Sequence, residues 1–155
     1  MKKHHIFLMV MALGMVGLLG CAQNGEEKAV VAKPAGPPIM FLSITSGAIE
    51  DTHSVTMALQ LAGHALDDER KVVLFFNVRA ADIPTKTFPG TIAFKDEPIK
   101  ALLADLIDRG AEVHVCPHCM QALAVNPDAL IKGAQVTDRE ALFSNLTSNT
   151  IVFTY

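Results

Sequence analysis

The clearest pattern along the chain is a pair of short apolar runs separated by a helical repeat. Residues 39–44 and 72–76 are nearly continuous apolar segments, which is typical of strands buried on both faces of a parallel sheet. Between them, apolar side chains recur at helical spacing over residues 55–66, and Asp51 or Thr52 is suited to cap the start of that helix. The pattern therefore predicts a strand–helix–strand unit.

The same alternation continues to the end of the chain. A second amphipathic helix is expected at residues 98–109, with Gly110 as its stop, and residues 113–115 predict a short third strand. After these we expect a helical turn, a weak strand, a short helix that begins with a T-x-x-E capping box, and a last strand. Their signals lie at residues 126–127, 135–136, 137–140 and 151–153, in that order.

Strands that alternate with helices indicate the α/β class. We expect a five-stranded, mostly parallel sheet with helices on both faces, a flavodoxin-like three-layer sandwich, with strand order 2-1-3-4-5. Ligands of such sheets bind beyond the carboxyl ends of the strands, so residues 45–51, 77–96 and 116–120 should share one rim. The segment 77–96 is long for a connection, which is typical of a lid or a subunit contact, and a disordered loop is the plainer alternative.

The first part of the chain has a different pattern. Two lysines precede an apolar run over residues 6–19, and a glycine and Cys21 follow. This layout is typical of a cleavable export signal, and the run is shorter than the roughly 20 apolar residues of a spanning helix. Because it resembles the bacterial lipobox, we expect residues 1–20 to be removed as a signal peptide and Cys21 to carry lipid. Ala22, by resemblance to other lipoproteins, favours the periplasmic side of the outer membrane.

Composition divides the remaining chain and limits its partners. Residues 21–38 contain many polar, glycine and proline residues, and such a segment has too little apolar surface to fold, so we expect a flexible tether. Residues 39–155 are then a single domain. The formal net charge is −3, and it becomes −5 when Lys2 and Lys3 are removed. This acidic balance argues against a nucleic-acid partner, which requires a basic surface.

The third strand leads directly into the C-x-x-C segment Cys116-Pro117-His118-Cys119. We expect Cys116 at the start of a helix, where unpaired N–H groups and the helix dipole favour a thiolate. A thiolate is nucleophilic, and the two-residue spacing lets Cys119 form a disulfide with Cys116. His118 is a candidate cation or proton donor beside Cys116.

Plainer interpretations of this segment stay open. The two cysteines are then small buried residues or form a structural disulfide, which contributes little because its loop is very short. A metal site would draw on these cysteines and on His114 or His118, but the chain has no second C-x-x-C and no H-x-x-x-H pair. We therefore expect neither a metal nor another cofactor.

Three residues on the same rim are weaker candidates for binding a substrate. Ser46 and Gly47 follow the first strand and are suited to offer backbone N–H groups near the thiolate. An ordinary turn explains these two residues equally well. Asn77 ends the second strand on the same rim.

Several segments together resemble a known family. They are residues 113–119 in their strand-to-helix setting, and residues 45–47, 74–78, 137–143 and 150–155. Over residues 39–155 the chain resembles the DsrE/DsrF/TusD-like sulfur-relay family. The resemblance implies a small α/β domain that assembles into trimers or hexamers and carries sulfur as a persulfide on Cys116.

Three functions follow from these observations. In the first, which the resemblance favours, Cys116 carries or transfers sulfane sulfur between donor and acceptor proteins or small sulfur species, and Cys119 is the resolving thiol. In the second, the pair forms the active site of a periplasmic thiol–disulfide oxidoreductase. In the third, the rim of a membrane-anchored, non-enzymatic module binds a metal or a small ligand. The sequence alone does not decide whether the chain turns over as a sulfurtransferase.

Overall fold

The computed structural model describes residues 36–155, and it confirms the expected α/β class. Five strands form one sheet in which every pairing is parallel. They are β1 (Ile39–Ile44), β2 (Val72–Phe76), β5 (Glu112–Val115), β6 (Ala134–Val136) and β7 (Thr150–Thr154). A separate antiparallel hairpin consists of β3 (Ala93–Phe94) and β4 (Glu97–Pro98). The expected signal peptide, Cys21 and most of the expected tether lie outside the described residues.

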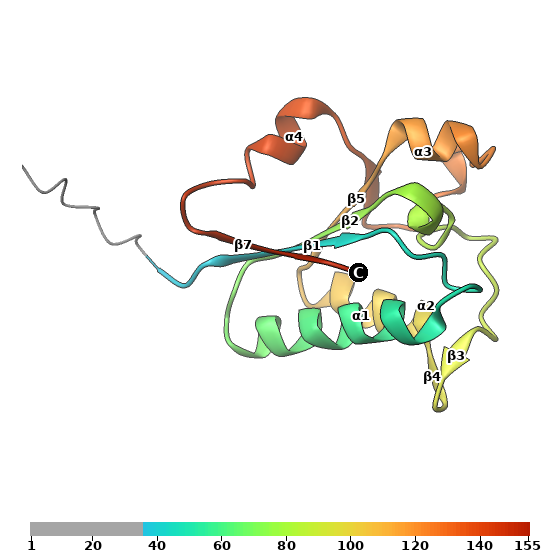
Figure 1. The fold of residues 1–155 in the computed structure, drawn as a ribbon, viewed down its shortest axis with the longest axis horizontal. Coiled ribbons are helices and arrows are strands. Elements are labelled where there is room, and N and C mark those ends of the chain that lie inside the picture. The colour runs from blue at the N-terminus through green and yellow to red at the C-terminus, as the bar shows by residue number, and fades with distance from the viewer. Residues whose placement is uncertain (1–35) are drawn as a thin grey trace, which may run out of the picture. The chain divides into compact units, whose positions relative to one another are not determined.

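Helices cover both faces of the sheet, as expected for this class. They are α1 (Thr52–Asp67), α2 (Ile99–Asp108), α3 (Pro117–Ala122) and α4 (Arg139–Phe143), with 3-10 turns η1 (Val78–Asp82) and η2 (Pro127–Ala129). Figure 1 shows α1 and α2 below the sheet and the shorter α3 and α4 above it. Among residues 36–155, no helix has the length and apolar character needed to cross a membrane.

The strands lie in the order β6-β5-β2-β1-β7, so the expected order 2-1-3-4-5 is wrong. β2 lies between β1 and β5, and β7 pairs with the other side of β1. The reason is visible in β2, whose five residues are all apolar. The expected order would place β2 at an edge, where an apolar strand is open to pairing with another chain. In the observed order β5 ends beside β2, which decides what surrounds the cysteines.

The main core lies between the sheet and the layer formed by α1 and α2. Every second strand residue faces these helices and is buried: Met40, Leu42, Ile44, Val72, Leu74, Phe76, Val113 and Val115. Val55 and Leu59 of α1 and Leu103 of α2 belong to the same cluster. Full burial of a side chain of this size contributes about 1.5–3 kcal/mol. The cluster therefore fixes the sheet whose carboxyl edge carries the site.

Local hydrogen bonds explain where the helices begin and end. Asp51 caps α1, as expected, because its carboxylate accepts a backbone N–H of the first turn at 2.9 Å. α2 ends before Gly110, whose φ is +99°. α4 is capped by Asp138, so the expected cap at Thr137 is wrong. The hydroxyl of Thr137 instead lies 3.2 Å from the ring of His114.

The long segment after β2 is packed against the domain. Ala80, Ile83 and Phe88 are buried in the core, and Thr85 forms an isolated bridge to Leu130. Farther along, the β3–β4 hairpin contacts α1, where the rings of Phe94 and His53 stack with centroids 4.2 Å apart. The expectation that residues 77–96 form a lid is therefore wrong, because the segment packs apolar side chains into the core and connects β2 to α2. Its expected role as a subunit contact stays a prediction.

Candidate functional site: the cysteine rim

A row of backbone hydrogen bonds extends the sheet beyond the strand ends. The N–H of Asn77 donates to the carbonyl of Ile44 at 3.0 Å, and the N–H of Cys116 donates to the carbonyl of Phe76 at 2.9 Å. The first residues after β2 and β5 are thereby fixed side by side. The structure thus brings Cys116 next to the turn that begins at Asn77.

Cys116 occupies the position before the first residue of α3, with extended backbone (φ −68°, ψ 118°). Pro117 begins the helix, where its missing N–H costs nothing. The Cys116 side chain makes no capping hydrogen bond, and the residue is partly exposed. Its Sγ therefore does not cap the helix, and the partly exposed residue can meet a reactant from outside.

Cys119 lies one helical turn farther along, and its Sγ accepts a hydrogen bond from the backbone N–H of Val78 at 3.0 Å. Burial raises the pKa of the Cys119 thiol, and a hydrogen bond with Cys116 raises it further. The N–H of Val78 lowers this pKa, whereas the charge of Cys116 raises it. Both cysteines are free thiols. Cys119 therefore keeps its proton at neutral pH, beside Cys116.

The turn at Asn77 and Val78 supports the site through its backbone. The Asn77 amide is buried and donates to the hydroxyl of Ser43 at 2.9 Å, so it holds the turn and is not open to a substrate. Val78 has φ +50°, which is rare for a β-branched residue. The sequence did not indicate Val78, because the residue type does not show where a backbone N–H points.

Ser46 and Gly47 lie at the end of β1, and β2 separates them from Cys116. Two strand spacings correspond to about 10 Å. The N–H of Ser46 already donates to the carbonyl of Tyr155 at 3.3 Å. Gly47 lies against the ion pair between Glu50 and Arg79, where a Cβ would contact both side chains. The expected N–H donation from Ser46 to the thiolate is therefore not made, and this turn contacts Arg79 instead.

The two histidines near the cysteines have different surroundings. His118 is exposed on α3 and has no hydrogen-bond partner within residues 36–155. His114 is buried, with Nδ1 3.2 Å from the Thr137 hydroxyl and Nε2 3.3 Å from the Gln135 amide nitrogen. Within the same range, no group of three or more His, Cys, Asp or Glu residues is arranged to hold a metal ion.

A polar cluster surrounds His114 on the face of the sheet below α4. Glu112 lies 3.6 Å from its ring and 2.8 Å from the ammonium of Lys71. Burial raises the pKa of Glu112, but the hydrogen bond and charge of Lys71, with bonds from His114 and Asn145, outweigh it and lower the pKa. The cluster is internally satisfied, so it stabilises the fold at β5 and offers no free group to the cysteines.

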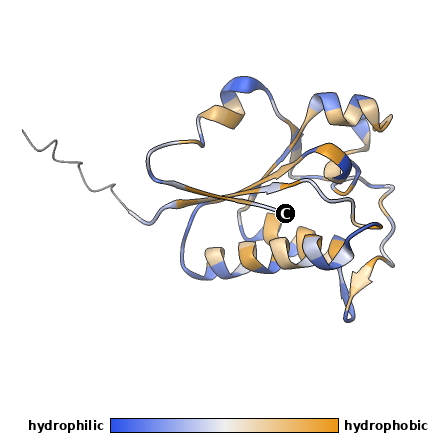
Figure 2. Cartoon of the chain, viewed as in Figure 1, coloured by the Kyte–Doolittle hydropathy of each residue, from blue (hydrophilic) through white to orange (hydrophobic). Residues whose placement is uncertain are grey.

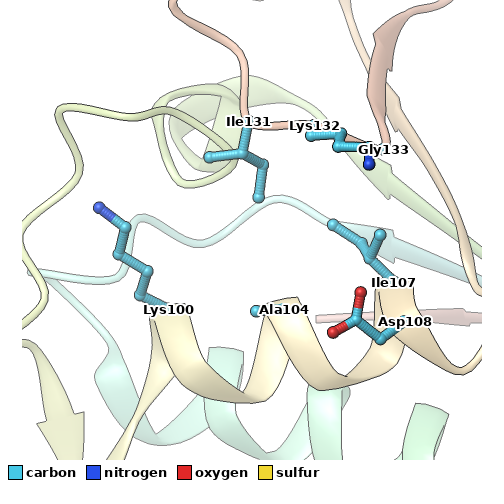
Figure 3. Close-up of a pocket in the computed structure, with 7 residues that line it drawn as sticks. All are labelled: Lys100, Ala104, Ile107, Asp108, Ile131, Lys132 and Gly133. Carbon is cyan, nitrogen blue, oxygen red and sulfur yellow. The ribbon is translucent and has the colours of Figure 1, made fainter.

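The hollow drawn in Figure 3 is lined by neither cysteine. It has a volume of about 560 Å³ and lies between α2 and the turn before β6. Its lining consists of Lys100, Ala104, Ile107, Asp108, Ile131, Lys132 and Gly133, with no sulfur atom among them. A smaller hollow of about 260 Å³ borders α3 at Pro117 and Met120. Cys116 and Cys119 line neither hollow and are both partly exposed, which suits a thiol presented by another molecule.

The sequence model of the DsrE/DsrF-like family matches residues 40–153. This chain belongs to the DsrE/DsrF-like family. Family membership confirms the resemblance inferred from the rim segments, and the DsrE-like proteins are generally related to sulfur relay. Among proteins with curated descriptions, none matches the chain.

Two solved structures share the DsrE-like fold. The YchN protein from E. coli has a TM-score of 0.59 and 17% identity, over 77% of this chain and 100% of that chain. MTH1491 from Methanobacterium thermoautotrophicum, described as a protein of unknown function, has a TM-score of 0.54 and 10% identity, with the same coverage. At these identities the likeness establishes the fold alone.

Proposed function

We propose that this DsrE-like chain carries sulfane sulfur as a persulfide on Cys116. The observation that carries the proposal is the position of the partly exposed Cys116 at the open end of β5, with a second, protonated thiol beside it. Membership of a sulfur-relay family supports the same function. His118, exposed two residues after Cys116, is suited to exchange protons with the incoming or leaving thiol.

The proposed transfer needs no external oxidant. The thiolate of Cys116 attacks the outer sulfur of a donor persulfide, R–S–SH, and forms the S–S bond of a Cys116 persulfide. The donor S–S bond breaks, and its electron pair leaves with the donor thiolate. An acceptor thiolate then attacks the outer sulfur of the Cys116 persulfide and takes it, which restores the Cys116 thiolate. Cys119 offers a second outcome, in which it attacks Sγ of the loaded Cys116 and expels sulfide.

Mass measurement after exposure to polysulfide tests this function. The full chain contains three cysteines, so Cys21→Ser is introduced to leave only the pair on the rim. We expect Cys119→Ser to gain the mass of one sulfur atom that dithiothreitol removes, and the double variant Cys116→Ser/Cys119→Ser to gain none. A gain that is equal in both variants, or absent from both, would falsify the proposal.

A second candidate function is thiol–disulfide exchange, which the C-x-x-C spacing of two free, partly exposed thiols favours. In that reaction Cys116 attacks a partner disulfide, and Cys119 resolves the mixed disulfide. Cys119→Ala would then accumulate a mixed disulfide with another protein. Recovery of such complexes, together with no sulfur uptake from polysulfide, would replace the first function by the second.

The proposal includes association between copies of the chain. The edge strand β7 exposes Ile151 (42%), Val152 (55%) and Phe153 (38%), and Phe143 of α4 is 60% exposed. Figure 2 shows β7 as an apolar strand. An exposed apolar edge strand is a ready surface for pairing with another chain. We propose that it serves a homo-oligomer, as the trimers or hexamers of the family imply.

The proposal also covers location. We propose that Cys21 is lipidated and that the domain faces the periplasm from the outer membrane, so donor and acceptor are envelope molecules. Labelling of cells with a palmitate analogue tests this, because Cys21→Ser should lose the label and leave the membrane fraction. Retention of label in Cys21→Ser would contradict the anchor and leave the sulfur chemistry unaffected.

A further inference from the structure

The turn after β2 gives one backbone N–H to a side chain instead of to the sheet. The N–H groups of Asn77 and Arg79 donate to carbonyls at the end of β1, at 3.0 and 3.2 Å. The N–H of Val78, which lies between them, donates to Sγ of Cys119 at 3.0 Å. Three successive backbone amides thus each donate a hydrogen bond, and the middle one donates to a thiol.

The surroundings hold Val78 in a conformation that its side chain disfavours. Its φ is +50°, and its side chain is 55% exposed, so packing of that side chain does not explain the conformation. The buried amide of Asn77 is bonded to Ser43, and the N–H of Ala80 donates to the carbonyl of Asn77 at 3.0 Å. A disfavoured backbone that its neighbours over-determine is typical of functional sites. Here the feature that it creates is the donor to Cys119.

The pKa of the Cys119 thiol depends on the state of Cys116. Burial raises the pKa of Cys119, and the hydrogen bond and charge of Cys116 raise it further, whereas the N–H of Val78 lowers it. When Sγ of Cys116 is bonded to a protonated or substituted sulfur, neither the charge nor the hydrogen bond of free Cys116 acts on Cys119. Burial and the N–H of Val78 then remain, so this loading lowers the pKa of Cys119 from its resting level.

We propose that the N–H of Val78 makes Cys119 a resolving thiol whose reactivity increases once Cys116 has been loaded. Resting Cys119 keeps its proton and does not compete with Cys116 for a donor. The nature of the load rests on the proposed function, whereas the dependence of Cys119 on Cys116 does not. Val78 acts through Cys119 and is a positioning residue.

The resolving step is balanced without an added oxidant. Cys119 loses its proton to water, and its thiolate attacks Sγ of the Cys116 persulfide. The Sγ–Sγ bond forms, the bond from Cys116 to the outer sulfur breaks, and hydrosulfide leaves with the electron pair. The sulfane sulfur is reduced to sulfide, and the two cysteines are oxidised to a disulfide.

Alkylation of Cys119 as a function of pH tests the dependence on Cys116. The reduced full chain with Cys21→Ser is treated with iodoacetamide, and the label at Cys119 is followed by peptide mass spectrometry. Cys116→Ser keeps a small polar side chain but carries no charge, so it imitates a Cys116 that has lost its thiolate. We expect Cys119 in Cys116→Ser to react several-fold faster at neutral pH, with its profile moved to lower pH. Rates that agree within about twofold at every pH would overturn the proposal.

Removal of the donor tests Val78 itself. In the Cys116→Ser chain, Val78 is replaced by its α-hydroxy acid, which exchanges the N–H for an ester oxygen and keeps the side chain. We expect the Cys119 profile to move to higher pH. The matched control replaces Ala80 by lactate, which removes an amide of the same turn that does not contact sulfur, and it should leave the profile in place. Equal profiles for the two esters would overturn the role of Val78.

A spectroscopic measurement covers the case in which the ester chain does not fold. In ¹⁵N-labelled Cys116→Ser, the amide resonance of Val78 should shift along the same pH curve as Cys119 alkylation, and a resonance that stays constant would overturn the proposal. None of these experiments uses a sulfur donor. If the chain takes up no sulfur but shows these shifts, the proposed function is wrong and the coupling between the two thiols still holds.

Discussion

Val78→Asn is expected to stabilise the domain by about 1 kcal/mol. A β-branched residue at φ +50° stores about 2 kcal/mol, within the usual range of 1–3, and asparagine tolerates this backbone region far better. The Val78 side chain is 55% exposed. The substitution therefore forfeits about half of the roughly 1.5 kcal/mol that full burial of valine contributes. The relieved strain exceeds this loss, which leaves a net gain.

The assay is urea unfolding of the reduced full chain, in which a change of midpoint at constant slope reports a change in stability. Val73→Asn is the matched control, because Val73 is fully buried in β2. Val73→Asn should lower the free energy of unfolding by about 3 kcal/mol or more, since it buries an amide and loses apolar contacts. Because Val78→Asn keeps the backbone N–H, the alkylation profile of Cys119 should stay as in the parent chain. A lower urea midpoint for Val78→Asn would refute the strained turn.

Three further predictions concern other parts of the domain. Gly133→Ala should lower the free energy of unfolding by about 2–4 kcal/mol, because φ is +91° and the new Cβ would collide with Ile107. Gly110→Ala, with φ +99° and open space around the new Cβ, should lower it by only about 1 kcal/mol. Equal losses of stability in thermal unfolding would contradict the packing at Gly133. Burial raises the pKa of Asp82 against the opposing effects of a backbone hydrogen bond and of Arg79. The contribution of this carboxyl to stability is therefore fully present below about pH 3.8, the ordinary pKa of the group. The contribution is lost as pH rises through the pKa of the folded state. Asp82→Asn should therefore be more stable than the parent at neutral pH, by less than about 1 kcal/mol because the group is half exposed, and urea midpoints that differ equally at pH 3 and at neutral pH would count against this. Val152→Lys, on exposed β7, should lower the oligomeric state in sedimentation without lowering the urea midpoint, and an unchanged sedimentation coefficient would exclude β7 from the interface.

The local elements could be predicted from the sequence because their patterns are strong. The apolar runs gave β1 and β2 with the bounds that the structure has, Ile39–Ile44 and Val72–Phe76. Strand order depends on which strands meet after the helices pack, and periodicity does not encode this. The wholly apolar β2 was still a usable signal, because it belongs in the interior of the sheet.

The site could be predicted only in part, and its errors follow from the strand order. Cys116 was placed at a helix start because a strand runs directly into Pro117 and a helical segment. Ser46 was expected to face the thiolate, but β7 pairs with β1 and brings the carbonyl of Tyr155 to the N–H of Ser46. Val78 was missed because its contribution is a backbone amide, whose direction is set by contacts with β1.

Cyanolysis of the loaded protein tests most directly whether Cys116 carries sulfane sulfur. The full chain with Cys21→Ser is incubated with polysulfide, freed of small molecules and treated with cyanide, which converts sulfane sulfur to thiocyanate. The account predicts about one thiocyanate per chain for Cys119→Ser and background for the double variant Cys116→Ser/Cys119→Ser, since persulfidation is a reversible modification of a reactive thiol. Equal thiocyanate from the two variants would contradict it.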